Sequence, residues 1–174
     1  MKTTQFKQKA KVGVAGSFFN QLMSNNSSLP KVGEGATQLH YTDRTCYEVI
    51  EVSDDFMRVK LEILNAVADK SKPCDVGHQN WILEPTGRYV TVVWRRFAWY
   101  QESTEITFVK EFFQKAESQN VSIWFLLTEE QRKQIYCDDV RPQVVVDGIT
   151  KKKKVYSKLN LLFGAKDYYY DWSF

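Results

Sequence analysis

The segment FMRVKLEIL, residues 56–64, carries the clearest strand signal in the chain. Four apolar residues alternate with three charged ones, so an extended segment would have one apolar face and one charged face. Displacing the strand by one residue would turn every apolar side chain to water, and we therefore expect a firmly set register. The apolar set is Met57, Val59, Leu61 and Ile63, and the charged set is Arg58, Lys60 and Glu62.

Further strands are indicated upstream and downstream of this segment. The alternation from Thr37 to Tyr41 predicts a strand that ends in a turn at Thr42-Asp43-Arg44, and CYEVIEVS (46–53) is rich in β formers. After a predicted loop at 65–78, QNWILE and RYVTVVWRRFAWY are strand-like. We interpret Pro85-Thr86-Gly87 between these two runs as a hairpin connection.

The hydrophobic pattern changes to a helical period between residues 104 and 139. Apolar residues recur at helical spacing in TFVKEFFQKAESQN (107–120) and predict a helix. Thr128 and Gln131 have the spacing of a capping box, which predicts the start of a second helix. Between them, VSIWFLL (121–127) predicts a short apolar strand. We therefore expect residues 104–139 to form a helical insertion between β elements.

The C-terminal region combines a turn signal with a basic run and an aromatic tail. Asp147-Gly148 is a strong two-residue hairpin signal. It precedes TKKKK (150–154) and a last predicted strand, SKLNLLFG (157–164). We expect the tail AKDYYYDWSF (165–174) to dock against the sheet or to mediate self-association, because so much apolar surface tends to be buried.

Together these signals predict an α+β, mainly β fold: a small curved antiparallel sheet or SH3-like barrel with a short N-terminal helix and a helical insertion. Aromatic residues make up 14% of the 174 residues, which also favours sheet. The short helix is expected from Ser17 onward, after a basic lead-in at 1–16. We expect residues 17–174 to form a single globular domain.

Composition argues against several classes of protein. The net charge of +3 is too small to indicate nucleic-acid binding by itself. No apolar run is long enough for a membrane span, and the N-terminus lacks a secretory signal, so we predict no membrane partner. Cys46, Cys74 and Cys137 are too scattered for a disulfide framework and indicate a reducing compartment. Cys74 and His78 are four residues apart, but no second closely spaced pair accompanies them among the remaining Cys and His residues, so we predict no metal site and no cofactor.

The charged pair Asp43-Arg44 is the first candidate for a ligand site. An arginine fork can pair with a phosphate or a carboxylate while the aspartate orients it, and His40 lies close in sequence. In the structural alternative, Asp43 caps a turn and Arg44 lies across the sheet edge. Both interpretations remain open at this point.

The run VVWRRFAWY (92–100) is the second candidate, because it interleaves aromatic residues with Arg95 and Arg96. Aromatic rings beside guanidinium groups suit a nucleotide or a single-stranded nucleic acid. In one continuous strand, however, Arg96 would share a face with Trp94, while Arg95 would share the other with Trp99. Core packing is therefore the favoured interpretation of these rings.

The lysine run Lys151–Lys154 is a third basic feature. Four adjacent positive charges could contact phosphate. Lysines on the edge of a sheet also discourage aggregation, and we favour a solvated hairpin flank for this run.

Three blocks of the sequence resemble a widespread family of small proteins encoded by bacteriophages and prophages. The blocks are VGEGATQLHYTDRTCYEVIEVS (32–53), HQNWILEPTGRYVTVVWRR (78–96) and LLFGAKDYYYDWSF (161–174), about a third of the chain. They match the family's VGxGAT, Ser/Thr-Asp-Arg, EVS and YYDxSF-like signatures, whereas the insertion at 104–139 departs from its shorter members. The resemblance implies a phage product in the host bacterial cytoplasm, with virion association left open. It places Asp43, Arg44, Tyr168 and Asp171 at signature positions.

These observations favour a non-enzymatic binding protein for a phosphate-bearing ligand, which is a nucleotide, a host-defence signalling nucleotide to be sequestered, or a short nucleic acid. The expected ligand residues are His40, Asp43, Arg44, Arg95, Arg96, Tyr168 and Asp171. One alternative is a protein–protein or virion-associated module that uses the aromatic tail, with a host protein, a phage protein or a second copy as partner. A second alternative is an enzyme acting on nucleotides, with His40 and Asp43 as acid and base.

Overall fold

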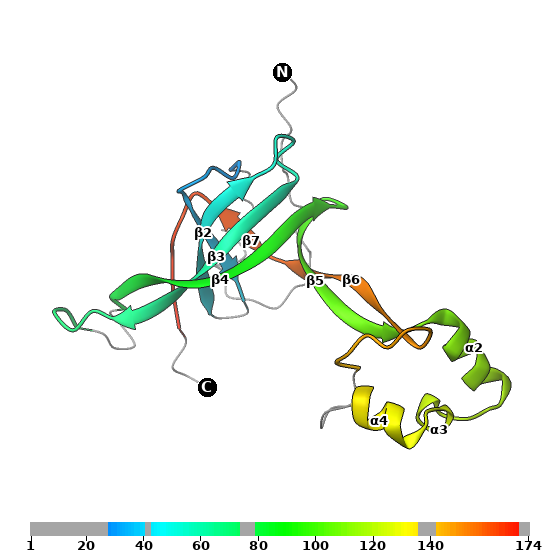
Figure 1. Cartoon of the computed structure of the whole chain (residues 1–174). Coiled ribbons are helices and arrows are strands. Elements are labelled where there is room, and N and C mark those ends of the chain that lie inside the picture. Colours follow the sequence, from blue (N-terminus) through cyan, green and yellow to red (C-terminus); the bar gives the residue numbers. More distant parts are fainter. Residues whose placement is uncertain (1–27, 41–42, 74–78, 136–141, 171–174) are drawn as a thin grey trace. The chain divides into compact units, whose positions relative to one another are not determined.

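The computed structural model describes residues 28–40, 43–73, 79–135 and 142–170 (Figure 1). Seven strands form one antiparallel sheet, and short helices lie in the chain between its fifth and sixth strands, so the predicted mainly β fold with a helical insertion is confirmed. The strands are β1 (Gly35–Leu39), β2 (Arg44–Val52), β3 (Arg58–Ala68), β4 (Trp81–Arg95), β5 (Ala98–Phe108), β6 (Thr150–Leu159) and β7 (Leu161–Phe163), and the helices are α2 (Lys110–Ser118), α3 (Ile123–Leu126) and α4 (Glu129–Ile135).

The order of the strands requires a strongly curled sheet. The order is β6-β5-β4-β3-β2-β1-β7, so β6 and β7 lie at opposite ends of it, although only Asn160 separates them along the chain. The two ends of the sheet must therefore approach each other. Consistent with this, the backbone N–H of Leu39 in β1 donates to the carbonyl of Asn160 at 2.8 Å. The sheet is a curled half-barrel, which confirms the predicted curvature.

The main core lies on the inner face of the curled sheet. Val59 and Leu61 of β3 are buried there, opposite Val92 and Val90 of β4. Residues directly opposite each other in an antiparallel pair share a face, so the apolar half of the segment 56–64 faces inward, as predicted. The core also contains Trp99, whose ring meets those of Trp94 and Phe163 edge-on at centroid distances of 5.4 and 5.1 Å.

The chain divides into two compact units. The first unit comprises Met1–Glu102 and Tyr156–Phe174 and contains the main core. The second unit, Ser103–Val155, contains the three helices and a small core of its own. In that core Phe108, Leu127 and Ile135 are buried, and Phe112, Ile123, Val146 and Ile149 pack against them.

The capping box predicted at Thr128 is present at the start of α4. The backbone N–H of Thr128 donates to Oε1 of Gln131 at 3.0 Å, and the backbone N–H of Gln131 donates to the hydroxyl of Thr128 at 3.2 Å. These reciprocal bonds satisfy two backbone donors that a helix start otherwise leaves without partners.

The predicted hairpin at Pro85-Thr86-Gly87 is wrong, because these residues lie inside β4. The register of β4 against β3 shifts there, between Glu62 and Leu64 of β3. The hydroxyl of Thr86 donates to the carbonyl of Ile63 at 2.6 Å, and Gly87 has φ +70°. Proline and glycine mark a bulge at this place, since both can interrupt a ladder without reversing the chain.

The reversal occurs at Arg96-Phe97 instead. Arg95 pairs with Ala98, and the two residues between them have φ values of 51° and 60°. Positive φ at both central residues is the type I′ geometry, which usually carries Asn-Gly. The sequence predicted a continuous strand at 88–100 because neither Arg nor Phe signals such a turn.

Other expectations also differ from the structure. Residues 65–68 extend β3 instead of starting a loop, and VSIWFLL contains α3 instead of a strand, because so short an apolar run has no decisive period. Asp147-Gly148 forms a turn, but residues 143–146 before it are not a strand, so there is no hairpin. The helix predicted from Ser17 lies outside the described residues.

Within the described part of the chain, each helix falls short of the length and apolar character that crossing a membrane requires.

Candidate functional site

The predicted pair Asp43-Arg44 lies at the turn between β1 and β2. The backbone N–H of His40 donates to the carbonyl of Asp43 at 2.9 Å, and Arg44 begins β2 opposite Leu39. Nε2 of His40 is 3.0 Å from the hydroxyl oxygen of Thr45. The structure thus brings three of the predicted ligand residues, His40, Asp43 and Arg44, to one turn.

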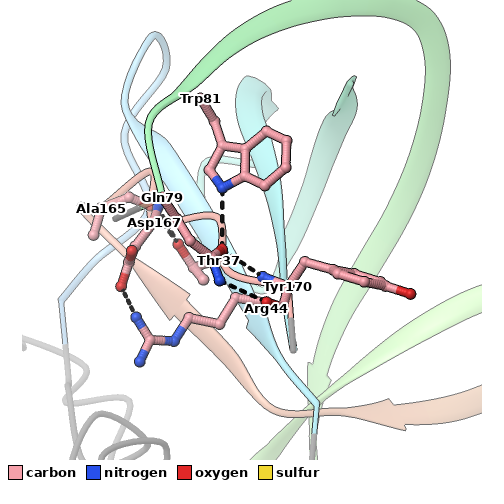
Figure 2. Close-up of polar contacts among 7 residues, drawn as sticks. All are labelled: Thr37, Arg44, Gln79, Trp81, Ala165, Asp167 and Tyr170. Atoms are coloured by element: carbon pink, nitrogen blue, oxygen red, sulfur yellow. Dashed lines mark hydrogen bonds and ion pairs between the residues drawn. The ribbon is translucent and has the colours of Figure 1, made fainter. Parts of the chain in front are cut away.

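Arg44 is engaged by the aromatic tail (Figure 2). Its guanidinium group forms an ion pair with Asp167. Its backbone N–H donates to the carbonyl of Tyr169 at 2.8 Å. The guanidinium carbon also lies 5.5 Å from the centroid of the Tyr169 ring. Only 16% of the Arg44 side chain is exposed. A phosphate bound by Arg44 would therefore have to compete with the carboxylate of Asp167.

Residues 165–170 dock against the sheet through contacts that we call the C-terminal clasp: these residues together with Thr37, Arg44, Gln79 and Trp81. The buried hydroxyl of Thr37 donates to the carbonyl of Ala165 at 2.9 Å and accepts from the backbone N–H of Asp167 at 3.1 Å. The side-chain amide of Gln79 bonds to both backbone groups of Tyr170, at 2.6 and 3.0 Å (Figure 2). The docking predicted for the tail is therefore confirmed up to Tyr170.

Close packing around Tyr168 and Gly35 completes the clasp. The rings of Trp81 and Tyr168 meet edge-on with centroids 5.1 Å apart, which places the predicted ligand residue Tyr168 in the clasp. A Cβ atom on Gly35 would lie 2.9 Å from the backbone of Ala165, so β1 requires a glycine where the tail passes. Asp171, another predicted ligand residue, lies outside the described residues.

Burial keeps two groups near the clasp neutral. It raises the pKa of the Cys46 thiol to about 12, and the carboxylate of Asp167 contributes to the rise. Burial also raises the pKa of Tyr168, with the carboxylate of Asp43 as the second cause. The protonated forms therefore persist at physiological pH. The Tyr168 hydroxyl can donate a hydrogen bond there, but it is not poised to act as a base.

Arg95 and Arg96 lie at the opposite end of β4 from Trp81. This strand has 15 residues, so at about 3.3 Å per residue it is roughly 50 Å long when measured along the backbone. The predicted ligand residues thus form two clusters, one in the clasp beside Trp81 and one at the far end of β4, and their combination in a single site stays a prediction.

Arg95 belongs to a network of side chains within the first unit. Its guanidinium carbon lies 4.1 Å from the centroid of the Tyr156 ring. The Tyr156 hydroxyl donates to Glu102 at 3.3 Å, and Glu102 also forms an ion pair with Arg58 at 2.5 Å. Both arginines are exposed: Arg95 is stacked on Tyr156, and Arg96 lies at the tip of the hairpin.

The tryptophans of the run 92–100 belong to the core, as the favoured interpretation required. Trp94 packs against the inner face and Trp99 is buried there. The face predicted for Trp99 is wrong, because the two-residue turn at Arg96-Phe97 brings Trp99 opposite Trp94. These two rings are therefore not a surface on which bases could stack.

Sequence reasoning missed two phenylalanines that lie in turns at the same end of the sheet. Phe56 is 39% exposed in the turn between β2 and β3, and Phe97 is 64% exposed in the turn between β4 and β5. The two turns are neighbours, because the backbone N–H of Trp94 donates to the carbonyl of Met57 at 2.7 Å. Both phenylalanines have positive φ, 57° and 60°, which is rare for bulky residues and which no sequence pattern announces.

All four lysines of the run Lys151–Lys154 are exposed in β6, the strand at one end of the sheet order. The solvated position agrees with the favoured interpretation, although the flank belongs to an edge strand and not to a hairpin. Side chains alternate along a strand, so Lys151 and Lys153 share one face about 6.6 Å apart. Lys152 and Lys154 share the other face.

In the part of the chain that the structure describes, neither a hollow at the start of α4 nor the side chains that commonly bind metals point to a further site. A surface hollow at the start of α4 is lined by Thr128, Glu129, Glu130 and Lys133, none of which is a predicted ligand residue. The described residues contain no group of three or more His, Cys, Asp or Glu side chains placed to hold a metal ion. Cys74, His78 and Cys137 lie outside the described residues.

Comparison of the chain with models of protein families, with curated proteins and with solved structures finds no match.

Proposed function

We propose that the protein is a non-catalytic binding protein for a phosphate-bearing ligand, and that this ligand is a short single-stranded nucleic acid. One observation carries the proposal: four consecutive lysines are exposed on the extended edge strand β6. Regular spacing of positive charge along a strand suits a chain of phosphates better than a single phosphate group.

The state of the predicted arginines supports an extended ligand over a single nucleotide. A nucleotide site normally encloses the base in a concave pocket and fixes the phosphate with converging donors. Arg44 is paired with Asp167, and Arg95 is stacked on Tyr156, so the guanidinium groups of both are already engaged. The lysines of β6 instead lie exposed along one extended strand.

The setting of this function follows from the resemblance to phage and prophage proteins. In this proposal the protein is a phage product that binds nucleic acid in the host bacterial cytoplasm. Sequestration of a host signalling nucleotide would need the Arg44 cluster to open, because Asp167 occupies that guanidinium group.

Fluorescence anisotropy with a labelled single-stranded oligonucleotide tests the proposal. We expect binding that weakens as salt concentration rises. In the variant Lys151→Gln/Lys153→Gln the slope of log K against log salt should fall by about 1.4, since each lost phosphate contact on a single strand contributes about 0.7.

The matched control is Lys110→Gln/Lys115→Gln, which removes the same charge from exposed positions of α2 in the same unit. The control should keep the wild-type slope. An equal decrease of the slope in both variants would show that binding depends on net charge alone. Undiminished binding in the β6 variant would show that Lys151 and Lys153 do not contact the oligonucleotide. Loss of binding in Arg44→Ala alone would return the site to the turn between β1 and β2.

A further inference from the structure

The end of the sheet that carries Phe56 and Phe97 is built as a rigid surface. In the turn between β2 and β3, the backbone N–H of Phe56 donates to the carbonyl of Ser53 at 2.8 Å, and the backbone N–H of Ser53 donates to the carbonyl of Arg58 at 2.9 Å. The Asp55 carboxylate accepts from the hydroxyl of Ser53 at 2.6 Å and from the backbone N–H of Met57 at 3.0 Å. These bonds hold Phe56 in place before any partner arrives.

The neighbouring turn is fixed by different means. The pair Arg95–Ala98 closes it, and Arg95 is anchored on the ring of Tyr156 at 4.1 Å. Arg96 and Phe97 both hold left-handed backbone conformations at the tip. Left-handed backbone at bulky residues is unfavourable, and such conformations are concentrated where a surface binds something. Exposed aromatic and arginine side chains on a rigid frame are also typical of interaction hot spots.

The charges beside the two rings have opposite signs. Asp54 is exposed next to Phe56, and Arg96 is exposed next to Phe97. Neither Asp54 nor Arg96 has an ion-pair partner in the part of the chain that the structure describes. A partner must therefore present an apolar centre with a positive group opposite Asp54 and a negative group opposite Arg96.

We infer that this surface, which consists of Asp54, Phe56, Arg96 and Phe97, binds a second copy of the chain. A two-fold axis that passes between the two turns and lies in the interface places Asp54 of each copy opposite Arg96 of the other. The same rotation sets the turn that holds Phe56 in each copy against the turn that holds Phe97 in the other. The surface is thus complementary to itself in charge and in apolar character, and the inference is independent of nucleic-acid binding by β6.

Sedimentation equilibrium over a wide range of protein concentrations tests this inference when wild type is compared with variants in which the charges of Asp54 and Arg96 are reversed singly and together. Wild-type protein should show a reversible monomer–dimer equilibrium. The single variants Asp54→Arg and Arg96→Asp should each weaken the dimer at least tenfold, because each sets like charges against each other in both symmetric contacts. The double variant Asp54→Arg/Arg96→Asp should regain most of the wild-type affinity.

The variant Phe97→Gly separates association from folding. Glycine accepts positive φ without strain, so this variant should melt at a higher temperature than wild type when both are monomeric, yet dimerise more weakly. A wild-type protein that stays monomeric at all concentrations overturns the inference, as does a double charge variant no better than the single ones. A dimer that persists unchanged in Phe97→Gly would likewise exclude this surface.

Discussion

The curled sheet differs at the two ends of its strands: the C-terminal clasp covers one end, which we call the closed end, and the turns that hold Phe56 and Phe97 form the other, which we call the open end. At one end the chain covers itself: the clasp supplies Thr37 and Gln79 with backbone partners from residues 165–170. At the other end two turns leave Phe56 and Phe97 exposed on a backbone of unfavourable conformation. The comparison teaches that the fold can engage a predicted site residue, as it does Arg44, while a turn that no sequence pattern predicted leaves its side chains exposed.

The largest expected effect comes from breaking the closed end at Thr37. Thr37→Val keeps the shape of the side chain but removes the hydroxyl that bonds to Ala165 and Asp167. Two half-buried backbone groups then lose their partner, and we expect the free energy of unfolding to fall by about 1–3 kcal/mol. Urea denaturation checks this value. A loss no larger than that of Thr104→Val, at an exposed position of β5, would show that the clasp does not stabilise the protein.

An intermediate effect is expected on the reactivity of Cys46. Its pKa of about 12 and its burial should make the thiol nearly inert to Ellman's reagent at pH 8, because the thiolate is the reactive form. In a Cys74→Ser/Cys137→Ser background, labelling should be slow and should accelerate when Gln79→Ala loosens the clasp at Tyr170. Fast labelling without that substitution would mean that the closed end opens readily.

The smallest expected effect concerns pH at the open end. The hydrogen bonds from Ser53 and Met57 lower the pKa of Asp55. A carboxyl whose pKa is lower in the folded state stabilises the protein above its unfolded pKa, and this contribution disappears as the pH falls through the folded pKa. Asp55→Asn should therefore lower the melting temperature slightly at pH 7 and hardly at all at pH 2–3. An equal decrease at both pH values would contradict the linkage.

Local patterns predicted part of this fold and little of its long-range pairing. The alternation in the segment 56–64 and the capping box at Thr128 involve residues close in sequence, and both are confirmed. Pro85 and Gly87 suggested a turn but lie at a bulge, because these residue types occur both in bulges and in chain reversals. The turn at Arg96-Phe97 was missed because it lacks glycine and asparagine.

The candidate site was only partly predictable for the same reason. Sequence reasoning placed His40, Asp43 and Arg44 at one turn, and the structure agrees. It could not show that Asp167 pairs with Arg44, since 123 positions separate the two residues and only the closure of the sheet brings them together. It also grouped Arg95 and Arg96 with Arg44, because a hairpin was predicted at Pro85-Thr86-Gly87. The structure has a bulge there instead, and β4 continues through it to Arg95.

The position of β7 has a consequence for the order in which the chain folds. Its partner β1 pairs Ala36 with Phe163, so this ladder joins segments more than 120 residues apart in sequence. Contacts of such high sequence separation form late and slow folding down, because the loop between them must be closed first. During synthesis, the free edge of β1 must therefore wait until residues 161–163 have left the ribosome, while β2, β3 and β4 can already pair. Until then one edge of β1 keeps its backbone groups available for pairing with another chain.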